Sequence, residues 1–582
     1  MKSQTKHWKL YPPAPRLHLD AGPEHPVLTQ VLYNRGVRVQ AEMAEFLAGN
    51  HAVKENPYRL KGMVEAVQRL LQAIDHHQTI CVYGDFDADG VTATALLVTA
   101  LQAVGARVGP YIPHRVDEGY GLNVDAMEAI ASKGAKVIIT VDCGIRSVAE
   151  VQRAVELGLD VIITDHHSIG PVIPPALAVI NPKRADNPDT FDGLAGVGVA
   201  YRLAQGVLRA VSERDGSTFS KAQVEEIETD LLDLVAIGTV ADMLPLVGEN
   251  RSLVQRGLTQ LNRTQRPGLL ALYTVAGVQP GTVDATTIGF RIAPRLNAAG
   301  RLDSAALAYK LLRTTDPAEA AELAQELEAL NQRRRTLTEE VSAQAEAQLT
   351  PQIAADAPLY VVSGPSFLSG IVGLVAGRLT DRLYRPTLVI EEGAEESRGS
   401  GRSIQEFHIT AALDEISHIL VRHGGHHMAA GFTLRSERLA EFKAAITAIA
   451  HRELGAYDGD LRPTLWVDAE LPLVDVNWGL THQLARLEPT GQGNPAPTFL
   501  FPNCRVRDHR TVGKGQHLKL TLSTGKGAEV MDAIAFGLGD WAGELKPGMR
   551  VDLVGQIGVN EWNNEKRLQL VVEDMRLADS GR

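Results

Sequence analysis

Cysteine is scarce in this sequence, and its three cysteines form no pattern. Cys81, Cys143 and Cys504 are widely separated, and no CxxC motif brings two of them together. Disulfide frameworks and thiolate metal sites both need paired or closely spaced cysteines. The spacing therefore argues against both, and we expect reduced, buried thiols.

Long apolar runs are also missing. No uninterrupted apolar stretch approaches the roughly 20 residues that span a bilayer, and the first residues, MKSQTKHWKLYPPAPRL, lack the apolar core of a signal peptide. We therefore expect a soluble, cytoplasmic protein with no membrane partner.

Positive charge is not in excess. The chain has 58 lysines and arginines against 70 acidic residues, which gives a net charge of -12. This balance argues against a protein coated with nucleic acid, but a local basic groove or bound metal ions would reverse the sign where it matters. Charge alone therefore does not decide the partner.

What the sequence does contain is a regular alternation of short β-rich runs and helical stretches from about residue 79 onward. The runs TICVYG, AKVIITVDCG and LDVIITDHH flank helical stretches such as VTATALLVTALQAVG. This is the pattern of βαβ units, in which helices cover a parallel sheet. The sequence therefore predicts an α/β fold, and 582 residues allow roughly three or four domains.

The second half of the chain predicts three further elements. A stretch from about 317 to 349, rich in Ala, Glu, Leu, Gln and Arg, predicts a connecting helix nearly 50 Å long, at about 1.5 Å per residue. A second α/β segment follows it. From about residue 464 the sequence changes to strands and turns, with one helical candidate at LGDWAGEL, which predicts an OB-like barrel.

Acidic residues recur where elements of the first α/β segment end. CVYGDFDADGVTA puts Asp85, Asp87 and Asp89 directly after a strand, and Asp242 follows the helical run AIGTVA. Two further predicted strands end in VDCG, which contains Asp142, and in TDHH, which contains Asp165, His166 and His167. Because the carboxyl ends of parallel strands share one crevice, we expect these groups to converge.

Converging carboxylates need a compensating cation, since several of them a few Å apart cannot all stay ionised. Oxygen ligands mixed with imidazole favour Mn²⁺ or Mg²⁺ over structural zinc. Two such ions about 3.5 to 4 Å apart activate a water molecule and stabilise a phosphoryl transition state. Hydrolysis of a phosphate ester is the chemistry that fits this arrangement best.

Each motif alone also has an ordinary explanation. The DxDxDG run resembles the start of a calcium-binding loop, but the glutamate expected at the twelfth position is replaced by Leu96. A single aspartate after a strand is usually a helix cap, and a histidine pair at a strand end is more often a capping or supporting pair. The recurrence of all four motifs in one α/β domain is what favours the metal site.

In this order, YGDFDADG, VDCG, DHH and GTVADMLPL resemble the four motifs of the DHH phosphoesterase superfamily. Further stretches, IPHRVDEGYGLN, INPK, LAGVGVA, FRIAPRLNAAGR, SGPSFLSGIVGLVAGRL, GSGRS and HGGHHMAAGF, resemble the RecJ family within it. The resemblance covers nearly the whole chain. It implies 5′ to 3′ removal of mononucleotides from single-stranded DNA, dependent on two Mn²⁺ or Mg²⁺ ions, in recombination and repair.

The resemblance also implies roles for the converging residues. The metal ligands would be Asp85, Asp87, Asp89, Asp142, His166 and Asp242, and the catalytic residues Asp142, Asp165, His166 and His167. Asp142 would bridge the ions, His167 would face the scissile phosphate, and Asp165 would orient the histidines. Whether Asp85 binds metal directly or only supports its neighbours stays open.

A second implied group would bind the substrate. Arg115, Ser400 and Arg402 would hold the 5′-terminal phosphate, with Arg378 nearby, and HGGH would contribute His423, Gly424, Gly425 and His426. Asn297, Arg295 and Arg301 are further candidate phosphate contacts. The ordinary alternatives are a solvated glycine-rich turn for HGGH and a surface ion pair for an arginine beside the long helix.

Cations also gather in the predicted barrel. They are Arg505, Arg507, Arg510, Lys514 and Lys519, with Trp562 in a later turn. Cations along a groove with an aromatic platform fit single-strand binding, but basic residues on exposed strands also protect sheet edges.

Domain limits and partners complete these expectations. We predict an N-terminal segment (1–50), a DHH domain (51–250), a connecting region with the long helix (251–350), a DHH-associated domain (351–460) and an OB-like domain (461–582). The resemblance suggests a monomer near the nucleoid that works with a single-strand-binding protein and a RecQ-type helicase.

Two rival functions stay open at this stage. One is a phosphodiesterase for very short oligonucleotides or cyclic dinucleotides, which would not need a barrel. The other is a catalytically silent DNA-binding scaffold, which would have lost its metal motifs, whereas every acidic and histidine position is intact here.

Overall fold

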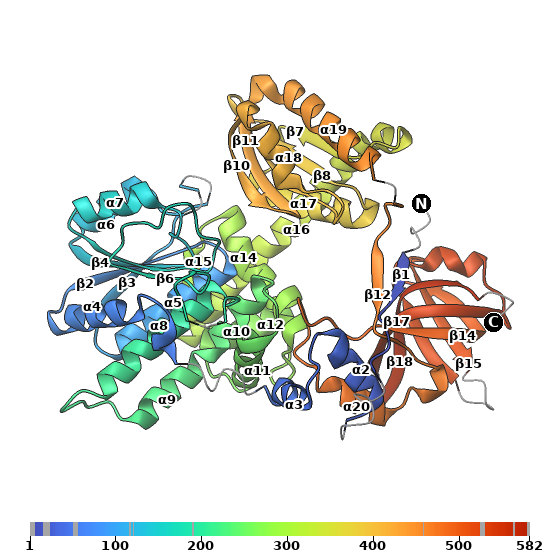
Figure 1. The fold of residues 1–582 in the computed structure, drawn as a ribbon, viewed down its shortest axis with the longest axis horizontal. Coiled ribbons are helices and arrows are strands. Elements are labelled where there is room, and N and C mark those ends of the chain that lie inside the picture. The colour runs from blue at the N-terminus through green and yellow to red at the C-terminus, as the bar shows by residue number, and fades with distance from the viewer. Residues whose placement is uncertain are drawn as a thin grey trace. The chain divides into compact units, whose positions relative to one another are not determined.

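The first half of the chain builds a five-stranded parallel sheet with the order β3-β2-β4-β5-β6 (Figure 1). The computed structural model describes residues 6–15, 24–49, 56–115, 118–119, 121–188, 191–457, 459–523, 530–562 and 565–578. The strands are β2 (Thr79–Gly84), β3 (Arg107–Tyr111), β4 (Ala135–Val141), β5 (Asp160–Thr164) and β6 (Ala178–Ile180). All four pairings are parallel, which confirms the predicted α/β fold.

Helices cover both faces of this sheet. On one face lie α6 (Val124–Ser132) and α7 (Val148–Glu156), and on the other α4 (Met63–Asp75), α5 (Ala88–Ala103) and α8 (Gly196–Ser212) (Figure 1). Helix α5 is buried along nearly its whole length because it packs between the sheet and other helices. This burial explains its largely apolar sequence and holds the acidic loop before it in place.

A helical region follows the sheet and ends in one long helix. Its shorter helices are α9 (Lys221–Asp230), α10 (Leu232–Ala241), α11 (Gly248–Leu261), α12 (Pro267–Ala276), α13 (Ala285–Thr287), α14 (Ala293–Leu302) and α15 (Ala306–Arg313). Helix α16 (Pro317–Ala354) has 38 residues and is therefore about 57 Å long. The predicted connecting helix is confirmed, and it extends five residues further than expected, past Pro351 in its last turns.

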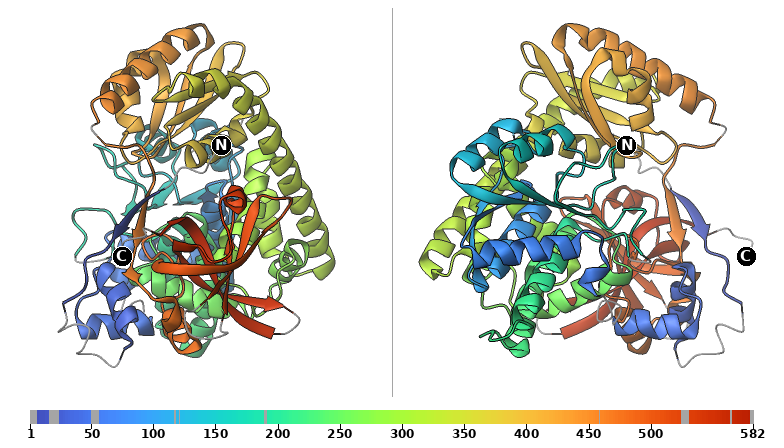
Figure 2. Two further views of the ribbon diagram at one scale, coloured as in Figure 1. Left: turned by 90° about the vertical axis from the view of Figure 1, so that its right-hand side faces the viewer. Right: turned by 60° about the vertical axis from the view of Figure 1, so that its left-hand side comes forward.

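A second sheet has the order β10-β11-β9-β8-β7. Its strands are β7 (Tyr360–Gly364), β8 (Thr387–Glu391), β9 (Glu396–Arg402), β10 (Leu420–His426) and β11 (Ala429–Arg435). Helices α16 and α17 (Ser369–Leu383) pack on one face, and α18 (Ile409–Glu415) and α19 (Leu439–Gly455) on the other. Figure 2 shows α16 as the straight rod that leads from the helical region to this sheet.

The chain divides into two compact units. One comprises Asn56–Leu244 and Arg256–Leu461, and so holds both sheets described above. The other comprises Met1–Glu55, Pro245–Gln255 and Arg462–Arg582. The predicted domain limits stay a prediction.

The second unit contains the barrel. Its six-stranded sheet has the order β13-β14-β15-β16-β18-β17, and a β14–β17 pairing closes it. The strands are β13 (Ala469–Glu470), β14 (Phe499–Val512), β15 (His517–Ser523), β16 (Val530–Ala535), β17 (Arg550–Trp562) and β18 (Glu565–Leu577). Beside it, β1 (His7–Leu10) pairs in parallel with β12 (Thr464–Val467).

One element of this unit was not predicted. Helix α20 (Trp478–Ala485) lies where only strands and turns were expected, and the expected helix at LGDWAGEL is a short 3₁₀ turn, Gly539–Gly543. Asn477 caps α20, and Leu480 and Leu484 pack with α2 (Pro26–Asn34) against the barrel core. The segments α2 and α3 (Gln40–Ala48), blue in Figure 2, thus complete the core of a barrel that is distant in sequence.

Two expectations from composition can be compared with the structure. All three cysteines are free; Cys143 and Cys504 are buried, and Cys81 is half-buried. Among the described residues, no helix combines the length and the apolar composition that a bilayer span requires.

Candidate active site

The acidic loop after β2 is held by the start of helix α5. Asp87 is the N-cap residue, and its Oδ1 accepts hydrogen bonds from the backbone N–H groups of Asp89 (2.9 Å) and Gly90 (3.1 Å). Asp85 is buried, and its Oδ1 has no hydrogen-bond partner among the residues that the structure describes. The loop therefore presents carboxylate oxygens that the protein itself does not fully satisfy.

Asp89 lies at the N-terminus of a second helix, α8. Its Oδ2 accepts a hydrogen bond from Gly196 N (2.8 Å) and its Oδ1 one from Val197 N (2.9 Å). Asp142 is close to the same turn, since a Cβ added at Gly196 would lie 2.6 Å from Asp142 Oδ1. A side chain at this position would therefore displace the carboxylate of Asp142.

Asp142, His166 and Asp242 meet although they come from β4, β5 and α10. His166 Nε2 lies 3.0 Å from Asp142 Oδ1 and 3.5 Å from Asp242 Oδ2. Asp142 follows β4 with a φ of 63°, a left-handed conformation that turns the chain sharply at the sheet edge. The predicted convergence of these three residues is confirmed.

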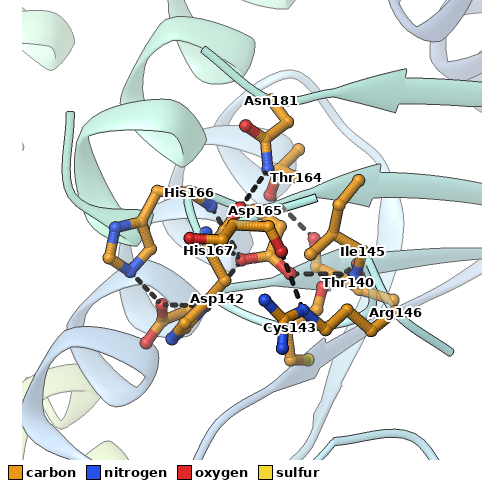
Figure 3. A network of polar contacts seen from close by, with 12 residues as sticks. Thr140, Asp142, Cys143, Ile145, Arg146, Thr164, Asp165, His166, His167 and Asn181 are labelled. Atoms are coloured by element: carbon orange, nitrogen blue, oxygen red, sulfur yellow. Dashed lines mark hydrogen bonds and ion pairs between the residues drawn. The ribbon is translucent and has the colours of Figure 1, made fainter. Parts of the chain in front are cut away.

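Asp165 lies at the centre of a network of polar contacts that holds the two histidines (Figure 3). Its Oδ1 accepts hydrogen bonds from the backbone N–H groups of His166 (2.7 Å) and His167 (3.0 Å) and lies 2.8 Å from His167 Nδ1. Its Oδ2 accepts one from Ile145 N (2.9 Å), and Asn181 Nδ2 donates to His167 O (3.0 Å). All the oxygens of Asp165 are thus engaged in holding the loop, so it does not face the cluster.

The carboxylates of the cluster resist ionisation. Burial and then the charges of neighbouring carboxylates raise the pKa of Asp89 to about 7 and that of Asp242 to about 9. The same causes raise the pKa values of Asp85 and Asp142 well above their usual range. Crowding of this kind is unfavourable without a cation.

The two histidines differ in charge preference. Burial, and then the neighbouring His167, lowers the pKa of His166 to about 3, so its imidazole stays neutral and able to bind a metal. Burial also disfavours the charged form of His167, but the hydrogen bond with Asp165 outweighs it and raises the pKa of His167.

The donor set suits a pair of hard divalent cations. Three overlapping groups bring potential ligand atoms within 4.8 Å of one another: Asp142, His166 and His167; Asp89, His166 and Asp242; and Asp85, Asp87 and Asp142. Neither ring nitrogen of buried His166 makes a hydrogen bond within the described part of the chain. Carboxylate and imidazole ligands without thiolates fit Mn²⁺ or Mg²⁺, and Asp142 belongs to two groups, as a shared ligand would.

Arginines from distant segments form a second cluster in the same unit. The Arg115 guanidinium lies 4.7 Å from the ring centre of Phe86, beside the acidic loop. Arg301 Nη1 donates to Gly370 O (3.0 Å), and Arg402 Nη1 donates to Ser400 Oγ (3.0 Å). Burial is the main cause that lowers the pKa of Arg301 to about 10, and the charges of Arg115, Arg334 and Arg402 lower it further. These cations are therefore neighbours.

Other predicted substrate contacts are engaged with the protein. Asn297 Oδ1 accepts a hydrogen bond from Ala88 N (2.8 Å), and Arg295 forms a buried ion pair with Glu328 (2.6 Å). In the HGGH motif, His423 Nε2 lies 2.7 Å from Asp414 Oδ1. Gly424, Gly425 and His426 are exposed on the edge strand β10.

The barrel cations lie mostly in solvent. Arg505, Arg507 and Arg510 are exposed on β14, and so is Lys514 in the following turn. Lys519 on β15 forms an ion pair with Asp532 (3.4 Å). The side chain of Trp562 lies outside the described residues.

The sequence prediction missed two contributors to the site. The sequence predicts no role for Gly196 in LAGVGVA, although a glycine in the first turn of a buried helix indicates a close approach. Arg334 and Arg335 belong to the charged surface of α16, and their sequence does not distinguish them from the solvated residues around them.

Comparisons with known proteins identify the family. Three family models match: the DHH family, N-terminal domain (residues 79–239), the DHHA1 domain (357–452) and the RecJ OB domain (467–574). The "Single-stranded-DNA-specific exonuclease RecJ" of Bacillus subtilis is 38% identical over 557 residues, 95% of this chain and 68% of the relative. That of Dickeya dadantii is 37% identical and covers 94% and 96% of the two chains.

A solved structure resembles nearly the whole fold. The crystal structure of RecJ with Mn²⁺ from Thermus thermophilus is 32% identical, with a TM-score of 0.83 over 99% of this chain and 80% of that one. With this fold, this cluster of acidic residues and histidines, and relatives of this identity and coverage, the chain belongs to the RecJ family of the DHH proteins.

Proposed function

We propose that the chain is a metal-dependent exonuclease that hydrolyses single-stranded DNA from its 5′ end and releases 5′-mononucleotides. The observation that carries this proposal is the cluster of buried Asp85 and Asp142 and half-buried Asp242 around the imidazole of His166, whose ring nitrogens make no hydrogen bond within the described residues. Two relatives that match 94–95% of this chain are named single-stranded-DNA-specific exonucleases.

The residues that would hold two Mn²⁺ or Mg²⁺ ions are Asp85, Asp87, Asp89, Asp142, His166 and Asp242. When bound, the ions supply Lewis acidity that activates water and stabilises negative charge on a phosphoryl group. Asp142 would be a ligand common to both ions, since it belongs to two of the three possible ligand groups. Asp165 fixes the ring of His167 through Nδ1, which assigns to Nε2 the contact with the scissile phosphate.

The arginine cluster determines which end of the strand enters. Arg115, Arg301 and Arg402, with Ser400, bind the 5′-terminal phosphate, and Arg378 supports them. Guanidinium groups bind phosphate oxygens in pairs, so a few of them give both affinity and orientation. The HGGH backbone grips the strand near the same end, and Asn297 acts through the first turn of α5.

The barrel binds the strand beyond the site of hydrolysis, through Arg505, Arg507 and Arg510. A monomer is sufficient for this arrangement. The protein acts in recombination and repair, in the cytoplasm at the nucleoid. A single-strand-binding protein and a RecQ-type helicase would supply its single strands.

The test replaces Asp142 with Ala and follows 5′-labelled and 3′-labelled single strands in Mn²⁺, with duplex DNA as a control for strand preference. The wild type should release labelled mononucleotides from the 5′ end, and Asp142→Ala should reduce the rate by about a thousandfold or more while single-strand binding persists. Asp125→Ala, an exposed aspartate at the start of α6, is the matched control. Undiminished hydrolysis by Asp142→Ala, or release from the 3′ end, would contradict the proposal.

A further inference from the structure

A cavity of about 300 Å³ lies between α16, α17 and β9. It adjoins the predicted 5′-phosphate contacts, since Arg402 forms part of its wall, but it extends away from them along α17. The cavity is lined chiefly by Arg334, Arg335, Gly373, Gly377, Arg378 and Asp381.

Two glycines one turn apart keep the α17 wall of this cavity open. A Cβ added at Gly373 would lie 3.1 Å from Ser400 Oγ and 3.3 Å from Arg402 Nη2. A Cβ added at Gly377 would meet only Arg402 Cγ, at 4.0 Å. The space therefore continues directly from the Ser400–Arg402 pair.

The cations of the cavity outnumber its one carboxylate, Asp381. Among the described residues, Arg334, Arg335, Arg378 and Arg402 form no ion pair. By contrast, Arg382, one turn further along α17, pairs with Glu346 at 2.6 Å. The cavity is thus unlike the surface around it, where arginines are matched by carboxylates.

Arg334 is built into this wall. Its Nη2 donates to Oδ1 of the fully buried Asn331 (2.9 Å), and its Nε is buried without a hydrogen-bond partner in the described part of the chain. Burial, and then the charges of Arg335 and Arg378, lowers the pKa of Arg334. A guanidinium held in place beside two others is costly unless an anion joins it.

One terminal phosphate does not account for this much charge. A 5′-monophosphate carries a charge of about -2 and is already matched by Arg115, Arg301 and Arg402 in the proposed function. Arg378 supports these three, so Arg334 and Arg335 form an excess that Asp381 only partly offsets. A second anionic group, covalently next to the first, would fit the direction in which the cavity extends.

We propose that this cavity is an extension of the 5′-phosphate pocket that accepts the further phosphates of a 5′-diphosphorylated or 5′-triphosphorylated strand. The inference rests on the proposed function, because it assumes that the first phosphate binds at Ser400 and Arg402. Water then attacks the phosphorus that links the first two nucleotides, and the 3′-oxygen of the first nucleotide leaves with a proton. The products are a nucleoside 5′-triphosphate and a strand with a new 5′-monophosphate.

The experiment compares single strands of one sequence that carry a 5′-monophosphate or a 5′-triphosphate, with products identified by mass. The wild type should release the nucleoside triphosphate as its first product. In Arg334→Gln/Arg335→Gln, the ratio of kcat/KM for the triphosphate strand to that for the monophosphate strand should fall about tenfold or more. Arg382→Gln should leave this ratio unchanged.

The outcomes separate this inference from the function on which it rests. Failure of the wild type to degrade the monophosphate strand would overturn the proposed function. Two results would overturn the extension alone, provided that the monophosphate strand is degraded normally. One is that the triphosphate strand releases no nucleoside triphosphate, and the other is that the ratio is unchanged in the double variant. Arg335→Gln, at an exposed position, provides the same comparison if the double variant is unstable.

Discussion

Oδ2 of Asp89 accepts a hydrogen bond of 2.8 Å from the backbone N–H of Gly196, a residue 107 positions later. The bond joins the acidic loop before α5 to the first turn of α8. A carboxylate at a helix N-terminus satisfies unbonded N–H groups and is favoured by the helix dipole. Asp89 is therefore a structural residue as well as a candidate metal ligand.

This double role predicts different stabilities for two variants of the metal-free protein. Asp89→Asn and Asp142→Asn both relieve repulsion between carboxylates, and Asp89→Asn also disturbs the two hydrogen bonds to the backbone N–H groups of Gly196 and Val197. We expect Asp89→Asn to be less stable than Asp142→Asn by about 2 kcal/mol. Chemical denaturation of both variants in a chelator measures the difference, and equal stabilities would mean that the bonds to α8 contribute little.

The close approach of Gly196 to Asp142 predicts a strong effect of a single methyl group. In Gly196→Ala, the new Cβ would lie 2.6 Å from Asp142 Oδ1, so the carboxylate must move. We expect mononucleotide release to fall by about tenfold or more while the circular dichroism spectrum is retained. Gly455→Ala is the control, because nothing lies within 4 Å of a Cβ added there. Full activity in Gly196→Ala would show that Asp142 tolerates displacement.

Removal of metal should make stability depend on pH in a defined direction. The pKa of Asp89 is raised to about 7 and that of Asp242 to about 9, whereas an unfolded aspartate has a pKa of about 3.9. The folded chain therefore binds more protons than the unfolded chain between these values. The free energy of unfolding should decrease as the pH rises from about 5 to about 9.

Denaturation at three pH values, in a chelator and in Mn²⁺, measures this effect. Mn²⁺ should largely remove the contribution of the cluster, since a cation compensates the ionised carboxylates. Asp242→Asn should show a shallower pH dependence than the wild type in the chelator. A wild type and variant with the same slope would assign the pH dependence to other groups.

The exposed arginines on β14 predict a change in the salt dependence of binding. In Arg505→Gln/Arg507→Gln, two phosphate contacts are lost, so the slope of log affinity against log salt should decrease by about 1.4 for a single strand. Fluorescence anisotropy of a labelled strand at several salt concentrations measures it. Arg567→Gln, which removes an exposed arginine paired with Glu565, should leave the slope unchanged. An unchanged slope in the double variant would exclude these arginines from the interface.

Much of the site could be predicted because it follows from sheet topology. Strands β2, β4 and β5 are neighbours and parallel, so the residues after them, Asp85 to Asp89, Asp142 and His166, necessarily meet at one edge. Local composition was equally informative for α16, whose length follows from the lack of glycine and internal proline before its last turns. Patterns within a segment are enough for these features.

Other features could not be predicted because they depend on contacts between segments. Helix α20 is short, and its two leucines are buried because α2 packs with them against the barrel core. The sequence of α20 alone does not show this contact. Asn297 resembles a phosphate contact in sequence, yet its carbonyl oxygen accepts a hydrogen bond from the first turn of α5. Which partner a polar side chain takes is decided by packing.

By itself, the sequence determined the α/β fold, the order of the acidic motifs and their position at strand ends, since these depend on local periodicity and on the geometry of parallel strands. Only the tertiary structure decided that Asp242 reaches His166 from a helix, that Asp89 caps α8, and that Arg334 and Arg335 face a cavity beside Arg402. These contacts join residues from separate elements. They can form and stabilise the fold only when those elements pack together.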